Sequence, residues 1–322
     1  EFEYAKHDRP SKFIPLGTIV TVFGTGSEMN NGAVITHEDK KIKGALWGAQ
    51  ADFAFLDPNY SMSVPFKQVI SGAFDTLSHA METYFGKPDE NNLSDDINEA
   101  VMRSTIRNIR VLLTDHNNYA ARSELAWASA MAENSILKIG KVTDFQCHIL
   151  EHQLGAYTNC NHGAGLAVLH PVLYRHICEA NTARFARFAV NVWGIDPEGK
   201  TEVELAHAGV EALAAFIKEI GLPTTFAELG IPADTDFAAI AKSTKLPIFI
   251  YNVPGRTGGK IEPPTVCKLA HDFPNIIGLK DASGDLDYAG YVAANAPEGF
   301  HLYSGDDNLT LPIVAVGGEG VV

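Results

Sequence analysis

The sequence has few cysteines, few basic residues and no long apolar run, and each shortage excludes a class of protein. The four cysteines among 322 residues form no Cys-x-x-Cys pair. This pattern is more typical of a protein in a reducing compartment than of one built on a disulfide framework. Lysine and arginine number 25 against 39 aspartates and glutamates, a net charge of −14, which disfavours nucleic acid or an anionic membrane as a partner. No apolar run approaches the roughly 18 residues of a membrane span, and the N-terminus has no signal pattern. We therefore expect a cytoplasmic protein that acts on a small molecule, and a homo-oligomer is compatible with this.

Hydrophobic periodicity divides the chain into three parts. Residues 13–60 contain short β-rich pieces at 13–16, 18–23 and 33–36. Apolar residues then recur every three or four positions, which predicts helices at 64–85, 94–113, 120–137, 144–157, 162–177 and 202–220. After residue 245, strands at 247–252, 275–280, 301–304 and 318–322 alternate with helices at 263–271 and 286–294. Such alternation predicts βαβ units with a parallel sheet, and hence an α/β protein with a large all-helical domain.

Four residues have the types and spacing of a metal site. Asp75 and His79 stand four positions apart in an apolar-periodic stretch, so one helix face presents a carboxylate beside an imidazole. His148 and His162 follow in two later segments separated by a polar turn. Three nitrogens and one oxygen suit Fe(II) or Zn(II). The alternative is that a chain with 12 histidines places some of them at helical spacing by chance.

Several strings resemble the iron-containing alcohol dehydrogenases, especially their butanol dehydrogenase-like branch, over residues 11–235. They include Phe23-Gly-Thr-Gly-Ser-Glu28, Phe55-Leu-Asp-Pro58 and the segments around the four metal-site residues. The resemblance implies that Asp75, His79, His148 and His162 hold the metal. It also makes His152 a candidate for proton handling near the reacting carbon.

The same resemblance implies a nicotinamide cofactor, NAD(P). It places Thr25, Gly26 and Ser27 on the cofactor side, although their spacing alone is that of a turn. The sequence has no Gly-x-Gly-x-x-Gly fingerprint, and the family's main pyrophosphate loop would precede residue 1. We therefore expect the N-terminus to be a cut, the cofactor site to be incomplete, and NAD(P)H affinity to be weak.

From about residue 237 the strings resemble the dihydrodipicolinate synthase and N-acetylneuraminate lyase family of class I aldolases. They are Leu246-Pro-Ile-Phe-Ile-Tyr-Asn-Val-Pro-Gly-Arg-Thr-Gly258, Asn275-Ile-Ile-Gly-Leu-Lys-Asp-Ala-Ser-Gly284 and Leu302-Tyr-Ser-Gly-Asp-Asp307. The resemblance implies the last four strands of a βα (TIM) barrel. It makes Lys280 the Schiff-base lysine, Tyr251 the proton-relay tyrosine and Arg256 a residue that binds the substrate carboxylate or shapes the site. The family's earlier strands, with their paired-threonine loop, are missing.

These features predict three domains and leave three functions open. Residues 1–62 would be a remnant of a dinucleotide-binding domain, 63–236 a helical metal-binding domain and 237–322 a partial TIM barrel. The leading function is a metal-dependent alcohol dehydrogenase, incomplete as it stands, that interconverts an alcohol and an aldehyde. The first alternative is a Schiff-base-forming aldolase or lyase acting on a pyruvate-like keto acid. The second is a fusion of two gene fragments without activity, since no Gly/Ser/Pro-rich linker separates the parts.

Overall fold

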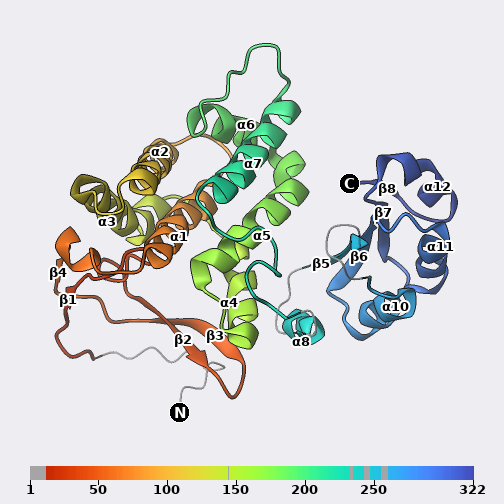
Figure 1. Cartoon of the computed structure of the whole chain (residues 1–322), viewed down its shortest axis with the longest axis horizontal. Helices are drawn as coiled ribbons and strands as arrows, with labels where there is room; N and C mark the ends of the chain where they lie inside the picture. The colour runs from red at the N-terminus through yellow and green to blue at the C-terminus, as the bar shows by residue number, and fades with distance from the viewer. Residues whose placement is uncertain (1–11, 144, 233–234, 243–246, 255–259) are drawn as a thin grey trace. The chain divides into compact units, whose positions relative to one another are not determined.

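The computed structural model describes residues 12–143, 145–232, 235–242, 247–254 and 260–322 (Figure 1). The chain forms two compact units, Glu1–Thr235 and Asp236–Val322. Each unit is described by itself. Within the described residues, no helix combines the length and the apolar character needed to cross a membrane.

Two small sheets begin the first unit. β1 (Gly17–Ile19) pairs in parallel with β4 (Phe53–Phe55), and β2 (Gly32–His37) pairs with β3 (Ile42–Trp47) as an antiparallel hairpin. The strand predicted at 18–23 ends early, at Ile19. The chain turns soon afterwards, at Gly24 and Gly26, both of which have positive φ angles that favour glycine.

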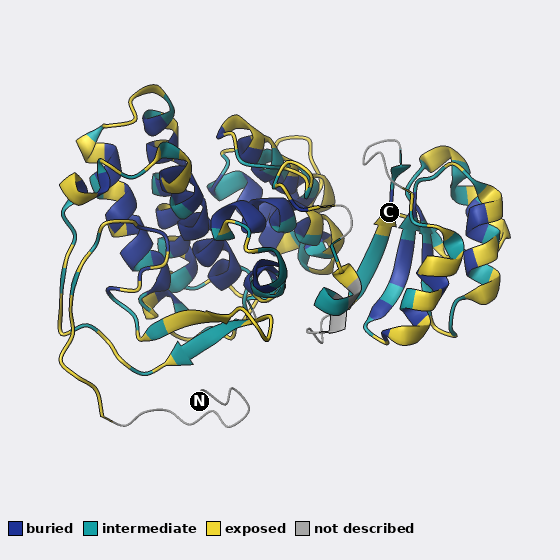
Figure 2. Cartoon of the chain, turned by 60° about the horizontal axis from the view of Figure 1, so that its bottom comes forward, coloured by how far each residue is buried: buried dark blue, intermediate teal, exposed yellow. Residues whose placement is uncertain are grey.

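Helices build the rest of the first unit (Figure 1). The described α-helices are α1 (Phe66–Tyr84), α2 (Leu93–Thr114), α3 (Tyr119–Glu133), α4 (Gln146–Thr158), α5 (His162–Ile177), α6 (Thr182–Asn191) and α7 (Glu202–Glu219). Short 3-10 helices lie at η1 (Pro58–Ser61), η2 (Ile136–Lys138) and η3 (Cys178–Asn181). Phe74, Leu77 and Met81 of α1 are fully buried in one core shared by most of these helices. Figure 2 shows the buried residues gathered inside this helical part.

In the first unit, one helix ends earlier than predicted and one helix was not predicted. The helix expected at 120–137 ends at Glu133 because Ser135 adopts a left-handed conformation, with φ of 72°. Helix α6 was not predicted, although Asn181 caps its start by accepting a hydrogen bond from the backbone N–H of Arg184. Its 10 residues offer only two or three apolar repeats, too few to recognise easily from spacing.

The second unit contains a four-stranded sheet in the order β5-β6-β7-β8, with all neighbours parallel. Its strands are β5 (Ile248–Asn252), β6 (Ile276–Asp281), β7 (His301–Ser304) and β8 (Gly320–Val321). Its helices are α8 (Phe237–Lys242), α10 (Pro263–Asp272), α11 (Leu286–Asn295), α12 (Thr310–Ala315) and the 3-10 helix η4 (Asp307–Leu309). Of these, α8 and α12 were not predicted.

The two faces of this sheet differ. Leu279 and Leu302 are buried in a cluster with residues of α10, α11 and α12, which lie along one side of the sheet in Figure 1. Phe249 of β5 and His301 and Tyr303 of β7, the two strands that flank β6, bring their rings within 6.0 to 6.4 Å of one another. Side chains alternate between the faces of a strand, so Leu302 and its neighbours His301 and Tyr303 face opposite ways.

Candidate metal centre and lysine site

Helix α1 carries three ionisable side chains on one face. Asp75, His79 and Glu82 stand at positions i, i+4 and i+7, which lie in line along a helix. All three are buried, at 3%, 7% and 6% exposure. Buried ionisable groups need partners, so this face has to meet polar groups from other elements.

Glu82 joins α1 to the start of α4. Its carboxylate accepts hydrogen bonds from the backbone N–H groups of Cys147, at 2.7 Å, and His148, at 3.2 Å. Both groups belong to the first turn of α4, where N–H groups have no partner inside the helix, and Phe145 before them supplies no side-chain cap. The same carboxylate accepts a hydrogen bond from Nδ1 of His148. The other ring nitrogen, Nε2, therefore faces Asp75, whose Oδ1 is 3.4 Å away.

The start of α5 places His162. The side chain of Asn161 accepts a hydrogen bond from the backbone of the first turn of α5 and another from the hydroxyl of Ser71 in α1. Gly163 allows the two helices to touch, because a Cβ atom there would lie 2.2 Å from the carbonyl oxygen of Ser71. This close approach brings Nε2 of His162 to 3.5 Å from Oδ1 of Asp75.

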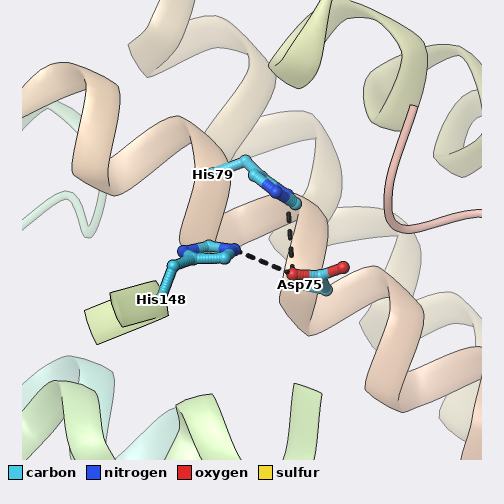
Figure 3. A group of neighbouring side chains, drawn as sticks. All are labelled: Asp75, His79 and His148. Carbon is cyan, nitrogen blue, oxygen red and sulfur yellow. Dashed lines mark ion pairs between the residues drawn. The ribbon is translucent and has the colours of Figure 1, made fainter. Parts of the chain in front are cut away.

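The three predicted histidine ligands thus meet around the fourth ligand, Asp75; Figure 3 shows Asp75 with His79 and His148. Oδ1 of Asp75 also lies 3.5 Å from Nδ1 of His79. Oδ1 of Asp75, Nδ1 of His79 and Nε2 of His148 are buried, lie within 4.8 Å of one another and make no hydrogen bond to any described residue. One cation would satisfy all three atoms, and a donor set of one carboxylate and imidazoles suits Fe(II) or Zn(II).

Neighbouring charges shift the pKa values of these groups. Burial alone would raise the pKa of Asp75, but His79, His148 and His162 lower it well below its usual range. Burial lowers the pKa of His79. Burial would also lower the pKa of His148, but Glu82 and Asp75 raise it to about 10. Since a metal binds only the deprotonated imidazole nitrogen, metal binding here is expected to release a proton.

A second carboxylate, Glu151 of α4, holds His162 from the outer side. It is fully buried, accepts a hydrogen bond from Nδ1 of His162 and lies 2.9 Å from the ammonium of Lys43. His152, one residue further, has its ring 5.6 Å from that of His162. Burial lowers the pKa of His152 to about 3, so its imidazole is neutral at pH 7. His152 thus lies beside His162. Of the four proposed ligands, His162 is the most exposed, with 27% side-chain exposure against 8% for His148.

The predicted cofactor residues lie in a turn next to the carboxylate of Asp75. Gly24 packs so closely against α1 that a Cβ atom there would lie 3.3 Å from Oδ2 of Asp75. Thr25 and Ser27 follow it, are exposed and share a hydroxyl hydrogen bond of 2.6 Å. Gly26 is buried, with φ of 57°. The two exposed hydroxyl groups thus belong to the turn that begins at Gly24, the residue that packs beside Asp75.

In the second unit, the structure brings Lys280 and Tyr251 together. They face each other in the register of β6 and β5, and Nζ of Lys280 lies 4.6 Å from the centroid of the Tyr251 ring. The adjacent Asp281 is buried and accepts a hydrogen bond from Asn252 at 3.0 Å. Arg256, the predicted carboxylate-binding residue, lies outside the described residues.

The sequence analysis did not identify Glu82, Glu151 or Lys43 as residues of this site. A signal existed for the two carboxylates, since Glu82 is seven positions after Asp75 and Glu151 three after His148, both on the ligand face of their helix. Lys43 precedes Glu151 by 108 positions and comes from a separate hairpin. No local pattern could have connected it to this site.

Residues 69–251 match the C-terminal part of the Fe-containing alcohol dehydrogenase family. The chain belongs to this family. Residues 232–322 match the dihydrodipicolinate synthetase family, so segments of two families are joined in one chain. Both resemblances predicted from the sequence are confirmed.

Individual relatives agree with this division. NADH-dependent butanol dehydrogenase B of Clostridium acetobutylicum is 34% identical over 268 residues, which cover 81% of this chain and 66% of that protein. The crystal structure of NADH-dependent butanol dehydrogenase A from Thermotoga maritima matches with a TM-score of 0.68 and 32% identity, over 72% of this chain and 58% of that one. The 4-hydroxy-tetrahydrodipicolinate synthase of Bacillus subtilis is 55% identical over 86 residues, 27% of this chain and 30% of that protein. The chain therefore spans less than two thirds of the length of either dehydrogenase and less than one third of the synthase. The predicted α/β class with a helical domain is confirmed by the structural match.

Proposed function

We propose that the first unit holds one Fe(II) or Zn(II) ion at Asp75, His79, His148 and His162 and interconverts an alcohol and an aldehyde with NAD(P). The observation that carries this proposal is the convergence of three buried ligand atoms without hydrogen bonds to described residues. The names of the relatives, NADH-dependent butanol dehydrogenases, support the reaction and the cofactor.

In this proposal, a metal ion held by Asp75, His79, His148 and His162 would supply a Lewis acid for the substrate oxygen. His152, whose ring lies 5.6 Å from that of His162, is the proposed residue that handles the proton of the alcohol. Thr25, Gly26 and Ser27 directly follow Gly24, which packs beside Asp75, and in this proposal they form the side of the site that faces the nicotinamide cofactor. Their two hydroxyl groups can donate hydrogen bonds to it.

The domain assignment belongs to the same proposal. Residues 1–62 contribute the cofactor side, 63–236 form the metal-binding helical domain, and 237–322 form part of a TIM barrel of the aldolase type. Because the sequence has no Gly-x-Gly-x-x-Gly loop to hold a pyrophosphate at a helix N-terminus, we expect weak NAD(P)H binding and little turnover from this chain alone.

Metal content tests the first part of the proposal. The chain is purified without oxygen, and iron and zinc are measured in the wild type and in Asp75→Ala, His162→Ala and His207→Ala. The control residue His207 has a half-buried side chain that pairs with Glu179 at 2.8 Å. We expect about one equivalent of metal in the wild type and in the control, and a loss in the other two variants. A wild type without metal would refute the proposal, and fluorescence titration with NADH would then show whether any cofactor site remains.

A second candidate function rests on the contact between Lys280 and Tyr251. In this alternative, the neutral amine of Lys280 attacks the carbonyl carbon of a pyruvate-like keto acid, water leaves and an imine forms. Tyr251 would pass the proton, and Arg256 would bind the substrate carboxylate. Borohydride with pyruvate should then attach the three-carbon unit to Lys280 in the wild type and not in Lys280→Ala. If neither bound metal nor an imine is found, the remaining hypothesis is a fusion of gene fragments without activity.

A further inference from the structure

We propose that Glu82 and Glu151 are positioning residues of unequal effect, because Lys43 cancels the charge of Glu151 and leaves Glu82 to attract the cation. This inference rests on the proposed metal site. It concerns residues outside the four ligands and assigns a role to each.

Both carboxylates hold a ligand histidine in the same way. Glu82 accepts a hydrogen bond from Nδ1 of His148, and Glu151 accepts one from Nδ1 of His162. In each case Nε2 is directed toward Asp75, at 3.4 and 3.5 Å from Oδ1. A carboxylate in this position fixes the tautomer and the ring orientation and makes the imidazole a stronger donor.

The two carboxylates differ in their other partners. Glu151 pairs with the ammonium of Lys43 at 2.9 Å, and this ammonium also lies 3.5 Å from Nδ1 of His162. Glu82 instead accepts two backbone N–H groups of α4, and no lysine or arginine pairs with it among the described residues. Once metal binding has released the proton of His148, the negative charge of Glu82 has no cationic partner, whereas that of Glu151 is neutralised by Lys43.

The chain makes room for the pair of Lys43 and Glu151. A Cβ atom at Gly155 of α4 would lie 3.0 Å from Nζ of Lys43 and 3.0 Å from Oε1 of Glu151. A Cβ atom at Gly165 of α5 would lie 3.0 Å from Cγ of Glu151. Both glycines thus leave space that a larger residue would fill. Strand β3 lies against α4 (Figure 1), so Lys43 of β3 can reach this space.

The charges add up to those of a divalent cation. Asp75, Glu82 and Glu151 supply three negative charges and Lys43 one positive charge, so two negative charges remain when the histidines are neutral. Glu133, which also acts on His79, is itself paired with a lysine at 2.6 Å. A buried site is most stable when its charges are compensated, and a 2+ ion compensates this one.

Cobalt(II) binding to the whole chain tests this inference. The protein is freed of metal, and dissociation constants are measured by chelator competition together with the visible d–d absorption of Co(II). The variants are Glu82→Gln, Lys43→Met, the double variant Lys43→Met/Glu151→Gln and the control Glu99→Gln. Glu99 is matched to Glu82 in burial, at 4% against 6% exposure, but binds α6 through Arg187. Circular dichroism and thermal melting report whether each variant folds.

We expect Glu82→Gln to bind Co(II) about 10 to 100 times more weakly, with a changed d–d spectrum. Lys43→Met should bind more tightly, by about tenfold or more, because a positive charge beside the cation is removed. The double variant keeps the net charge and should bind within about threefold of the wild type by the same Coulomb argument. Glu99→Gln should lose stability without loss of affinity.

Two results would overturn the inference: Glu82→Gln binding as tightly as the wild type, or Lys43→Met binding more weakly. The second result stands even if Glu82→Gln does not fold. A wild type that binds no Co(II) would instead refute the metal site itself, so the two failures are distinguishable.

Discussion

Metal binding should stabilise the first unit and leave the second unit unchanged. All four proposed ligands lie in Glu1–Thr235, so the second unit is an internal control in the same chain. At a free zinc concentration about 1,000 times the dissociation constant, a ligand that binds only the folded state stabilises it by about 4 kcal/mol. Since 1 kcal/mol shifts Tm by roughly 2 to 4 °C for a unit of this size, the first transition should rise by about 8 to 16 °C.

The variant Asp75→Asn keeps the size of the side chain and removes its charge from the centre of the site. If the affinity falls about a thousandfold, the same zinc concentration equals the dissociation constant and contributes only about 0.4 kcal/mol, a shift of about 1 °C. Differential scanning calorimetry with zinc and with EDTA measures both transitions at once. Equal shifts in both units, or a full shift in Asp75→Asn, would refute the reasoning.

Three further changes test other parts of the structure. Glu82 raises the pKa of His148 to about 10, and this stabilises the metal-free protein fully below pH ~6.5. The stabilisation should be lost as the pH rises toward 10. Urea unfolding should therefore give a lower free energy of unfolding at pH 9.5 than at pH 7, and the difference should be smaller in His148→Gln. Gly163→Ala places a Cβ atom 2.2 Å from the Ser71 carbonyl, so it should cost about 1 to 3 kcal/mol of stability and weaken metal binding, measured by denaturation and chelator competition. The carboxylate of Asp95 is buried between a lysine and an arginine, each at 2.5 Å, so Asp95→Ala should cost about 3 to 5 kcal/mol; a loss under 1 kcal/mol would contradict this.

The sequence predicted the parts of the metal site that depend on local spacing. Asp75 and His79 lie about one turn apart on the same helix, and hydrophobic periodicity identifies that helix without any tertiary information. His148 and His162 were candidates by residue type, and the motif resemblance supported their assignment as ligands. The structure then brings all four around one carboxylate oxygen, through the Asn161 cap and the contact at Gly163.

Interactions between distant segments could not be predicted. Glu82 meets the first turn of α4 across 65 positions, and Lys43 reaches Glu151 across 108. Neither contact leaves a periodic signal, because each depends on how helices and the β2–β3 hairpin pack. The short elements α6, α8 and α12 were missed for a related reason, since packing rather than intrinsic propensity stabilises short helices.

The central claim is that one cation binds among Asp75, His79, His148 and His162, and anomalous X-ray scattering tests it most directly. Crystals of the zinc-loaded chain are measured on both sides of the zinc absorption edge. We predict one anomalous peak about 2.0 to 2.2 Å from the Asp75 carboxylate and from one nitrogen of each histidine. A map without a peak there, or with its peak on other residues, would contradict the account.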